Sequence, residues 1–389
     1  MAHVWRPGKM NERTNAEIEN MTVHTFKSSS SSPEIIKINK GLIRENHRNR
    51  RQTNVMVDTN ILLTIEIAYN GSQRHRDLKD AGIIDLARLI ETTSKYGVFI
   101  SPAAAYQELP PARRAPVEAA FERFCKDYLP KFGDDPNSVK VPFSGESFEP
   151  EAFGALSSER QTTIACSYAS LLALNVIHRL EALDGFEKFT LYIDYCEEVL
   201  NLISLKELTI ARYVFAPEKG MTDDVRTRKS ATVNNFTKLK KGGAKGLTLA
   251  QELQRIALNG ANDLKLISAA DIVNNSREQF KFGVIEHDVW IATRDEKLYE
   301  FCCACPGFVG WGAGGPLARF VDTHEDLKGT RYWKDTIALQ QQRLEARYAT
   351  VDRAREMDDI VNAAFNIEAD LLDDRAIAYF SKRSWRSEE

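Results

Sequence analysis

Four segments of this chain, far apart in the sequence, combine an apolar stretch with an acidic residue. Two of them are β-branched runs that lead to an acid, namely Val55–Val57 before Asp58 and Val289–Ile291 before Asp295. Runs of this kind, separated by helical segments, predict βαβ units and a parallel sheet. In an open parallel sheet, ligands bind beyond the carboxyl ends of the strands. We therefore expect Asp58 and Asp295 to lie together at one edge of an α/β fold.

The other two acids are expected on helices. Glu108 follows the predicted strand 98–101 on a short helical stretch, and Asp263 is expected to open the apolar helix 264–273. Several carboxylates in one crevice repel one another strongly unless a divalent cation neutralises them. Because the ligands would all be oxygens, the expected ion is Mg²⁺ or Mn²⁺.

Each acid also has an ordinary structural role open to it. Asp58 and Asp295 can cap the helices that follow them. Glu108 can be a solvated helix acid, and Asp263 can stabilise a helix start through the helix dipole. What favours a shared site is the joint occurrence of the four acids, in this order, at predicted strand ends and helix starts.

Two further acids compete with Asp263 for the third position. Asp271 lies eight residues later, roughly 12 Å along a helix, so both cannot belong to one tight metal centre. Asp288 precedes the fourth predicted strand and would lie at the opposite end of the sheet. We therefore expect Asp263 to be the third acid.

At these residues the chain resembles the PIN-domain nucleases. That family has an acid in a strand-end V-D-T-N segment, a glutamate on a following helix, an aspartate that opens a later helix, and a strand-end T-x-D segment. The matching segments here are Val57–Asn60 and Thr293–Asp295, with Glu108 and Asp263 between them. Residues 318–327 resemble the last short strand and closing helix of the family. The gaps on both sides of Asp263 are longer than is usual in the family.

The resemblance implies a three-layer α/β/α fold with a central parallel sheet and a catalytic, metal-binding role for the four acids. Asn60 and Thr293 would orient the carboxylates through hydrogen bonds. The implied activity is metal-dependent endonucleolytic hydrolysis of phosphodiester bonds, most often in RNA, as in a toxin or a phage-defence effector. Two alternatives stay open: a DNA or flap-type nuclease with the same site, and a catalytically weak PIN-like module that binds RNA or a protein.

Periodicity predicts the individual elements and divides the chain into parts. Residues 1–51 are polar and contain a five-serine run, so we expect a disordered N-terminal segment. The expected strands are 54–57, 98–101, 289–292 and 318–322, and the expected helices are 83–93, 118–132, 158 to about 183, 186–201 and 205–215. The expected parts are a PIN-like core over 52–110 and 250–328, a helical insertion over 111–249, and a C-terminal helical tail over 329–389.

A basic segment lies just upstream of the third acid. Residues 226–245 contain seven basic residues, no acid and one aromatic residue, Phe236, and glycines at 242, 243 and 246 make the end of the segment flexible. A mobile basic loop with an aromatic side chain suits single-stranded nucleic acid, and a solvated linker is the alternative. The candidate substrate-binding residues are Arg226, Arg228, Lys229, Lys238, Lys240, Lys241 and Lys245.

Composition limits the cellular setting and the partners. The 389 residues carry a formal net charge of −3, so attraction to nucleic acid must be local. Six cysteines without disulfide-framework spacing, and an N-terminus without an apolar signal segment, favour a cytoplasmic protein with no membrane partner. The expected partner is single-stranded or structured RNA; a second copy of the chain or an inhibitory protein is an additional candidate.

Overall fold

The computed structural model describes the positions of most of the chain. The described residues are 23–27, 37–132, 152–202, 204–239, 247–275, 277–280, 283–305, 307–312, 315–320, 329–348 and 357–383.

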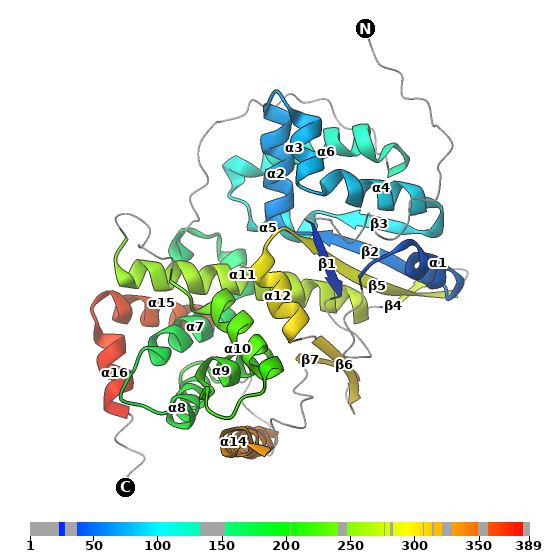
Figure 1. Cartoon of the computed structure of the whole chain (residues 1–389). Helices are drawn as coiled ribbons and strands as arrows, with labels where there is room; N and C mark the ends of the chain where they lie inside the picture. The colour runs from blue at the N-terminus through cyan, green and yellow to red at the C-terminus, as the bar shows by residue number, and fades with distance from the viewer. Residues whose placement is uncertain are drawn as a thin grey trace.

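One mixed, largely parallel sheet organises the half of the molecule that carries the predicted strands (Figure 1). Its path is β1-β5-β2-β3, in which β2 pairs in parallel with both β5 and β3, while β1 and β4 each pair antiparallel with β5. The strands are β1 (His24–Lys27), β2 (Arg51–Val57), β3 (Val98–Ser101), β4 (Arg277–Phe280) and β5 (Gly283–Thr293). The α/β class is therefore confirmed, and the three predicted strands 54–57, 98–101 and 289–292 all lie in this sheet.

The register of the parallel strands brings their carboxyl ends level. Val57 at the end of β2 stands opposite Ala292 near the end of β5. On the other side of β2, Met56 stands opposite Ser101, the last residue of β3. Residues that directly follow these strands therefore emerge at one edge of the sheet, as the sequence predicted.

The central strands place alternate side chains in two different hydrophobic cores. Val55 and Trp290 belong to the first core, which also contains residues of α2 to α6, whereas Met56 and Ile291 belong to the second core, which contains residues of the later helices. This alternation follows from the two-residue period of a strand. Both faces of β2 and β5 are consequently covered, and all of these side chains are buried.

Helices from the first third of the chain enclose the first core above the sheet in Figure 1. They include α4, which matches the predicted crossover helix between the first two strands. The elements are α1 (Lys40–Arg48), α2 (Thr59–Asn70), α3 (Arg74–Asp80), α4 (Ile83–Thr93), η2 (Ser94–Tyr96), α5 (Ala103–Glu108), α6 (Pro111–Tyr128) and η3 (Pro130–Phe132). Because α6 packs on α2 and α4, it belongs with the sheet rather than with a helical insertion that begins at residue 111.

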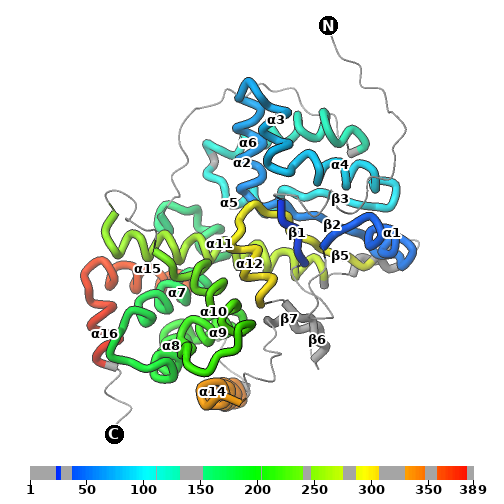
Figure 2. The backbone as a smooth tube through the Cα atoms, viewed as in Figure 1, coloured from blue at the N-terminus to red at the C-terminus, as the bar shows by residue number. Residues whose placement is uncertain are grey.

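The remaining helices form a second body around α7, which α15 and α16 also contact (Figure 2). The C-terminal helices thus share the second core with the predicted insertion and are not a separate tail. The elements are η4 (Phe153–Ala155), α7 (Ser158–His178), α8 (Gly185–Glu198), α9 (Leu205–Phe215), α10 (Asp223–Phe236), α11 (Leu249–Asn275), α12 (Glu296–Ala304), α14 (Arg331–Tyr348), α15 (Met357–Leu372) and α16 (Arg375–Arg383).

Two predictions about the ends of the core are wrong. The described part of the N-terminal segment is not disordered: β1 pairs with β5, and Val23, Phe26 and Ile43 are buried. These few apolar side chains are enough to order the segment, because they pack against a sheet edge and helix surfaces that the rest of the chain forms. The last predicted strand, 318–322, also does not join the sheet. β7 (Gly315–Phe320) pairs antiparallel with β6 (Gly307–Gly312) in a separate hairpin, and residues 321–328 lie outside the described residues.

Two local predictions differ in detail. Helix α7 is capped by Ser157, whose side chain accepts a hydrogen bond from the backbone N–H of Arg160, and not by Ser158. It ends at His178, before the expected end near Leu183. Within the described residues, no helix has the length and apolar content needed to cross a lipid bilayer.

Candidate functional site

Asp58 sits at the junction of β2 and β5, where the sheet and a hydrogen-bond network hold it from several sides. Its backbone N–H donates to the carbonyl of Ala292 at 2.9 Å, which extends the β2–β5 ladder by one residue. Its Oδ2 accepts hydrogen bonds from Thr293 Oγ1 at 2.5 Å and from Asn60 Nδ2 at 2.6 Å. Although Asp58 directly precedes α2, its side chain makes no capping hydrogen bond there. The carboxylate is thus directed to the edge of the sheet.

Asp295 is joined to the same network through Thr293. Its backbone N–H donates to Thr293 Oγ1 at 2.9 Å, and Asn60 Nδ2 donates to that hydroxyl at 3.1 Å. The side chain also caps α12, because Oδ1 accepts from the backbone N–H groups of Lys297 and Leu298 at 2.9 and 3.2 Å. Asp295 therefore does have the helix-capping role that the sequence allowed. The cap holds Oδ1, whereas Oδ2 takes no part in it.

Glu108 reaches the group from the last residue of α5. Its Oε2 accepts a hydrogen bond from Thr59 Oγ1, the residue directly after Asp58. Its backbone carbonyl accepts from Arg160 Nη2 on α7 at 2.8 Å. The side chain is half-buried between these contacts, so the alternative role as a freely solvated helix acid does not hold.

Asp263 also joins the group, although its predicted position in the secondary structure is wrong. It lies in the interior of the long helix α11 and does not open a helix. Its Oδ2 accepts hydrogen bonds from Asn235 of α10 at 3.2 Å and from Asn259 at 3.5 Å. The apolar run 264–273 predicted a helix start at Asp263, but α11 begins at Leu249 and continues through Gly260.

Gly260 instead permits a close approach between helices. A Cβ atom added there would lie 2.8 Å from the ring of Phe236 and 2.9 Å from a methyl group of Leu171. Phe236 and Leu171 are fully buried, so neither has free space to give way. The missing side chain lets α11 pack tightly against α7 and α10, and this packing carries Asp263 to the sheet edge.

Electrostatic interactions show that the four acids form one group, the acidic cluster. The pKa of Asp58 is raised to about 6, because burial and the smaller effect of the Asp295 charge outweigh the lowering effect of the hydrogen bonds from Thr293, Thr59 and Asn60. Burial followed by the charge of Asp58 raises the pKa of Glu108 to about 8. Burial also holds the pKa of Asp263 well above its ordinary value, and the charges of the other three acids add to this effect.

The donor chemistry of the acidic cluster suits a hard divalent cation. Each acid commits one carboxylate oxygen to a side-chain or capping hydrogen bond, as described above. In the described part of the chain, the second oxygen of each makes no side-chain hydrogen bond. Yet no three acidic, histidine or cysteine side chains among the described residues are close enough to share one ion as they stand. A shared ion would therefore require rotation of these side chains.

The two competing acids are engaged elsewhere in the fold. Asp271 forms an ion pair with Lys206 at 2.8 Å. Asp288 accepts from Asn46 at 2.6 Å and from the indole N–H of Trp290 at 2.8 Å, and it pairs with Lys27 at 2.7 Å. Both are buried structural acids with compensating partners. The structure therefore separates them from the acidic cluster.

The described part of the predicted basic loop, residues 226–239, is mostly helical. Residues 226–236 belong to α10, and Phe236 is fully buried against Phe301, so it is not available for base stacking. Arg226 pairs with Asp223, and Lys229 bonds to the carbonyl of Ala216. Thr222 caps this helix and favours it over a loop. Of the remaining candidates, Arg228 also lies on α10, Lys238 bonds to Asn234, and Lys240, Lys241 and Lys245 lie outside the described residues.

Sequence reasoning missed three contributors to the site. Thr59 holds Glu108, Asn235 holds Asp263, and the charge of Lys265 on α11 lowers the pKa of Glu108. Only Thr59 carried a signal, since it is part of the V-D-T-N segment. Asn235 and Lys265 depend on helix packing that local sequence does not encode.

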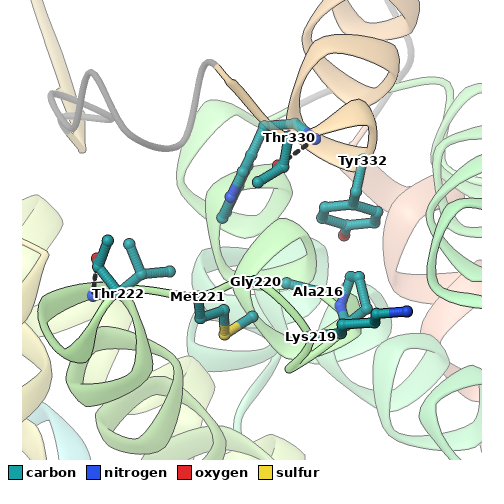
Figure 3. Close-up of a pocket in the computed structure, with 10 residues that line it drawn as sticks. Ala216, Lys219, Gly220, Met221, Thr222, Thr330 and Tyr332 are labelled. Carbon is teal, nitrogen blue, oxygen red and sulfur yellow. Dashed lines mark hydrogen bonds between the residues drawn. The ribbon is translucent and has the colours of Figure 1, made fainter.

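Among the described residues, a small cavity beside the start of α14 lies away from the acidic cluster. Figure 3 shows the loop that carries Ala216, Lys219 and Met221 facing Thr330 and Tyr332 at the start of α14. Its volume is about 20 Å³, which is room for about one water molecule. It is therefore too small to bind a substrate. In comparisons with known proteins, no family model matches the chain, and no curated protein or solved structure shows significant similarity to it.

Proposed function

We propose that this chain is a metal-dependent nuclease of PIN-like architecture that hydrolyses phosphodiester bonds in RNA. One observation carries the proposal: four acids from separate segments lie close enough together that the charges of their neighbours in the cluster help to raise the pKa of Asp58, Glu108 and Asp263. Ionising a buried group of acids costs free energy, and a divalent cation offsets that cost. Such clusters of perturbed carboxylates are typical of functional sites.

The arrangement of the elements supports the finer architectural proposal. Alternate residues of β2 and β5 enter two helical cores, which is the pattern expected of a three-layer α/β/α fold. Asp58 and Asp295 then occupy the strand-end positions of a PIN-like site, and Glu108 and Asp263 occupy the helix positions.

In this proposal the residues divide the work between binding and orientation. When bound, Mg²⁺ or Mn²⁺ would hold the scissile phosphate and acidify the attacking water. Asp58 and Asp295 are the main ligands, since both are fixed through Thr293. Asn60 limits the rotation of Asp58 by a second hydrogen bond to the same oxygen. Hydrogen-bonded support of this kind keeps carboxylates in binding orientation.

Glu108 is the candidate for accepting the proton of the attacking water. As the water oxygen bonds to phosphorus, the bond from phosphorus to the leaving oxygen breaks, and that oxygen takes up a proton from solvent. Without a cation, a carboxyl group whose pKa is about 8 is mostly protonated near neutral pH, so Glu108 would accept the water proton only after a nearby cation lowers that pKa. Thr59 fixes Oε2, so Oε1 is the atom that would receive the proton.

The direct test is incubation of the purified chain with total RNA in Mn²⁺ and, in parallel, with a chelator. We expect cleavage in Mn²⁺ only, and none by Asp58→Asn. Asp85→Asn, a change in an exposed acid of α4 that pairs with Arg88, is the matched control and should cleave normally. Cleavage of DNA flaps but not RNA would favour the alternative nuclease. Failure to cleave either substrate with any divalent metal would overturn the proposal.

A further inference from the structure

A groove of about 610 Å³ opens beside the acidic cluster, between α5 and α6 on one side and η4, α7 and α11 on the other. It therefore lies where the sheet-bearing part meets the second helical body. Its volume falls within the roughly 300–1,000 Å³ of pockets that hold a small molecule or a cofactor. The charged and aromatic side chains that line it are Tyr106, Arg114, Glu159, Arg160 and Lys265.

The groove is continuous with the neighbourhood of Glu108. Gln107 and Leu109, on either side of Glu108 in the sequence, both line it. Arg160 lines it too, and its Nη2 atom donates to the carbonyl of Glu108 at 2.8 Å. Lys265 enters it from α11, two residues after Asp263, and its charge acts on Glu108. A ligand in the groove would thus lie next to the acidic cluster.

The lining is locally basic in a chain whose formal net charge is −3. Among the lining residues, Arg114, Arg160 and Lys265 oppose a single acid, Glu159, and Arg114 also pairs with Glu118 on its own helix at 2.9 Å. Guanidinium and ammonium groups are the side chains that bind phosphate oxygens. The acidic cluster would repel a polyanion, so cations beside it are needed where such a substrate must approach.

The groove is also lined by an aromatic side chain, Tyr106, which lies next to these cations. Tyr106 is half-buried, its ring packs edge-on against Phe121 at 6.4 Å between centroids, and the guanidinium of Arg114 lies 5.9 Å from its centre. Phe121 is buried, so the tyrosine ring has a fixed support. Rigid aromatic faces next to cations are the usual means of holding single-stranded bases.

We propose that this groove holds a single-stranded segment of the RNA next to the scissile phosphate. Arg114 and Lys265 bind backbone phosphates, Arg160 holds the end of α5 in place, and Tyr106 stacks on a base. The groove has room for one or two nucleotides and not for a duplex. This inference rests on the proposed function, and it assigns to α7 a part in substrate selection.

The test measures binding separately from cleavage. The full chain is titrated with fluorescent oligouridylate in a chelator, at several salt concentrations. The main variant is Arg114→Gln with Lys265→Met, which leaves the Arg160 contact intact. Glu159→Gln removes the one opposing charge, and Arg331→Gln changes an exposed arginine of α14 that is paired with Asp335. Thermal unfolding of each variant checks that the fold is kept.

We expect the double variant to bind at least about tenfold more weakly, since two charge-assisted contacts with phosphate are lost. The slope of log affinity against log salt should become shallower by about 1.4, or about 0.7 for each phosphate that the variant no longer neutralises. Glu159→Gln should bind more tightly, and Arg331→Gln should bind like the unchanged chain. A duplex of the same length should compete poorly.

The outcomes separate this inference from the proposed function. Unchanged affinity and slope in the double variant would overturn the groove assignment, even if the chain cleaves RNA. Equal binding of duplex would also overturn it. Weakened binding in the double variant without any metal-dependent cleavage would support the groove and refute the nuclease.

Discussion

The strand-end half of the acidic cluster and its helical half are built in different ways. Asp58 and Asp295 directly follow paired strands, share Thr293 as a hydrogen-bond partner and need only local structure to meet. Glu108 and Asp263 reach the same place from α5 and α11, whose positions depend on helix packing. Under the proposed function, the first pair is the rigid part that would hold the metal, whereas the second pair is adjustable.

The first way to test this comparison is to remove one ligand charge from each half. We expect Asp58→Asn to lower the cleavage rate by at least about a thousandfold, because loss of an outer partner alone typically costs 10–100-fold. Asp263→Asn should be less damaging than Asp58→Asn, and yet far more damaging than Asp271→Asn or Asp288→Asn. Rates with saturating Mn²⁺ are the measurement. An inactive Asp288→Asn with a normal Asp263→Asn would reverse the assignment.

The rigidity of the strand-end half can be tested through Thr293. Thr293→Val keeps the shape of the side chain but removes the hydroxyl that donates to Asp58 and accepts from the backbone of Asp295. We expect cleavage to fall roughly 10–100-fold, with the loss partly restored at high Mn²⁺. Thr92→Val on the exposed part of α4 serves as the control. Full activity of Thr293→Val would show that the strand ends do not need this support.

The packing dependence of the helical half can be tested at Gly260. We expect Gly260→Ala to lower the free energy of unfolding by roughly 1–3 kcal/mol, because the added methyl group meets Phe236 and Leu171 in a filled core. Gly329→Ala, at a position with open space, should be neutral. Chemical denaturation measures both variants. A stable Gly260→Ala chain with normal activity would mean that close helix packing does not position Asp263.

The metal-free cluster should also make stability depend on pH. The pKa values of about 6 for Asp58 and about 8 for Glu108 lie above the unfolded values of about 4. Between those limits the folded chain binds more protons than the unfolded chain, so stability falls as pH rises from about 4 to about 8. Thermal unfolding in a chelator measures this decline. Mn²⁺ should reduce it, whereas a decline that is identical in Asp58→Asn would assign it to other groups.

The sequence predicted the strand-end half of the acidic cluster better than its helical half. The strands around Asp58 and Asp295 were predictable because apolar alternation and strand ends are local signals. The hydrogen bonds that Asn60 and Thr293 donate to Asp58 could also be predicted, because each of these residues lies two positions from an acid of the cluster. The place of Asp263 was predicted for the wrong reason: it was expected to open a helix, but it lies inside α11, which Gly260 allows to pack closely against α7 and α10.

Other features of the fold could not be predicted from local sequence at all. The pairing of β1 with β5 joins residues separated by more than half the chain, and a short polar-flanked segment carries no sign of its partner. The basic residues on α10 looked like a mobile loop because neither the capping by Thr222 nor the burial of Phe236 is evident from composition. Tertiary contacts decided both cases.

Direct measurement of Mn²⁺ binding tests the central claim, that acids from both halves form one cation site. Isothermal titration of the chain at neutral pH should give saturable binding that is lost in Asp58→Asn and strongly weakened in Asp263→Asn. Asp271→Asn, an equally conservative change in the same helix, should bind like the unchanged chain. Absence of binding, or equal binding by Asp263→Asn and Asp271→Asn, would contradict the account.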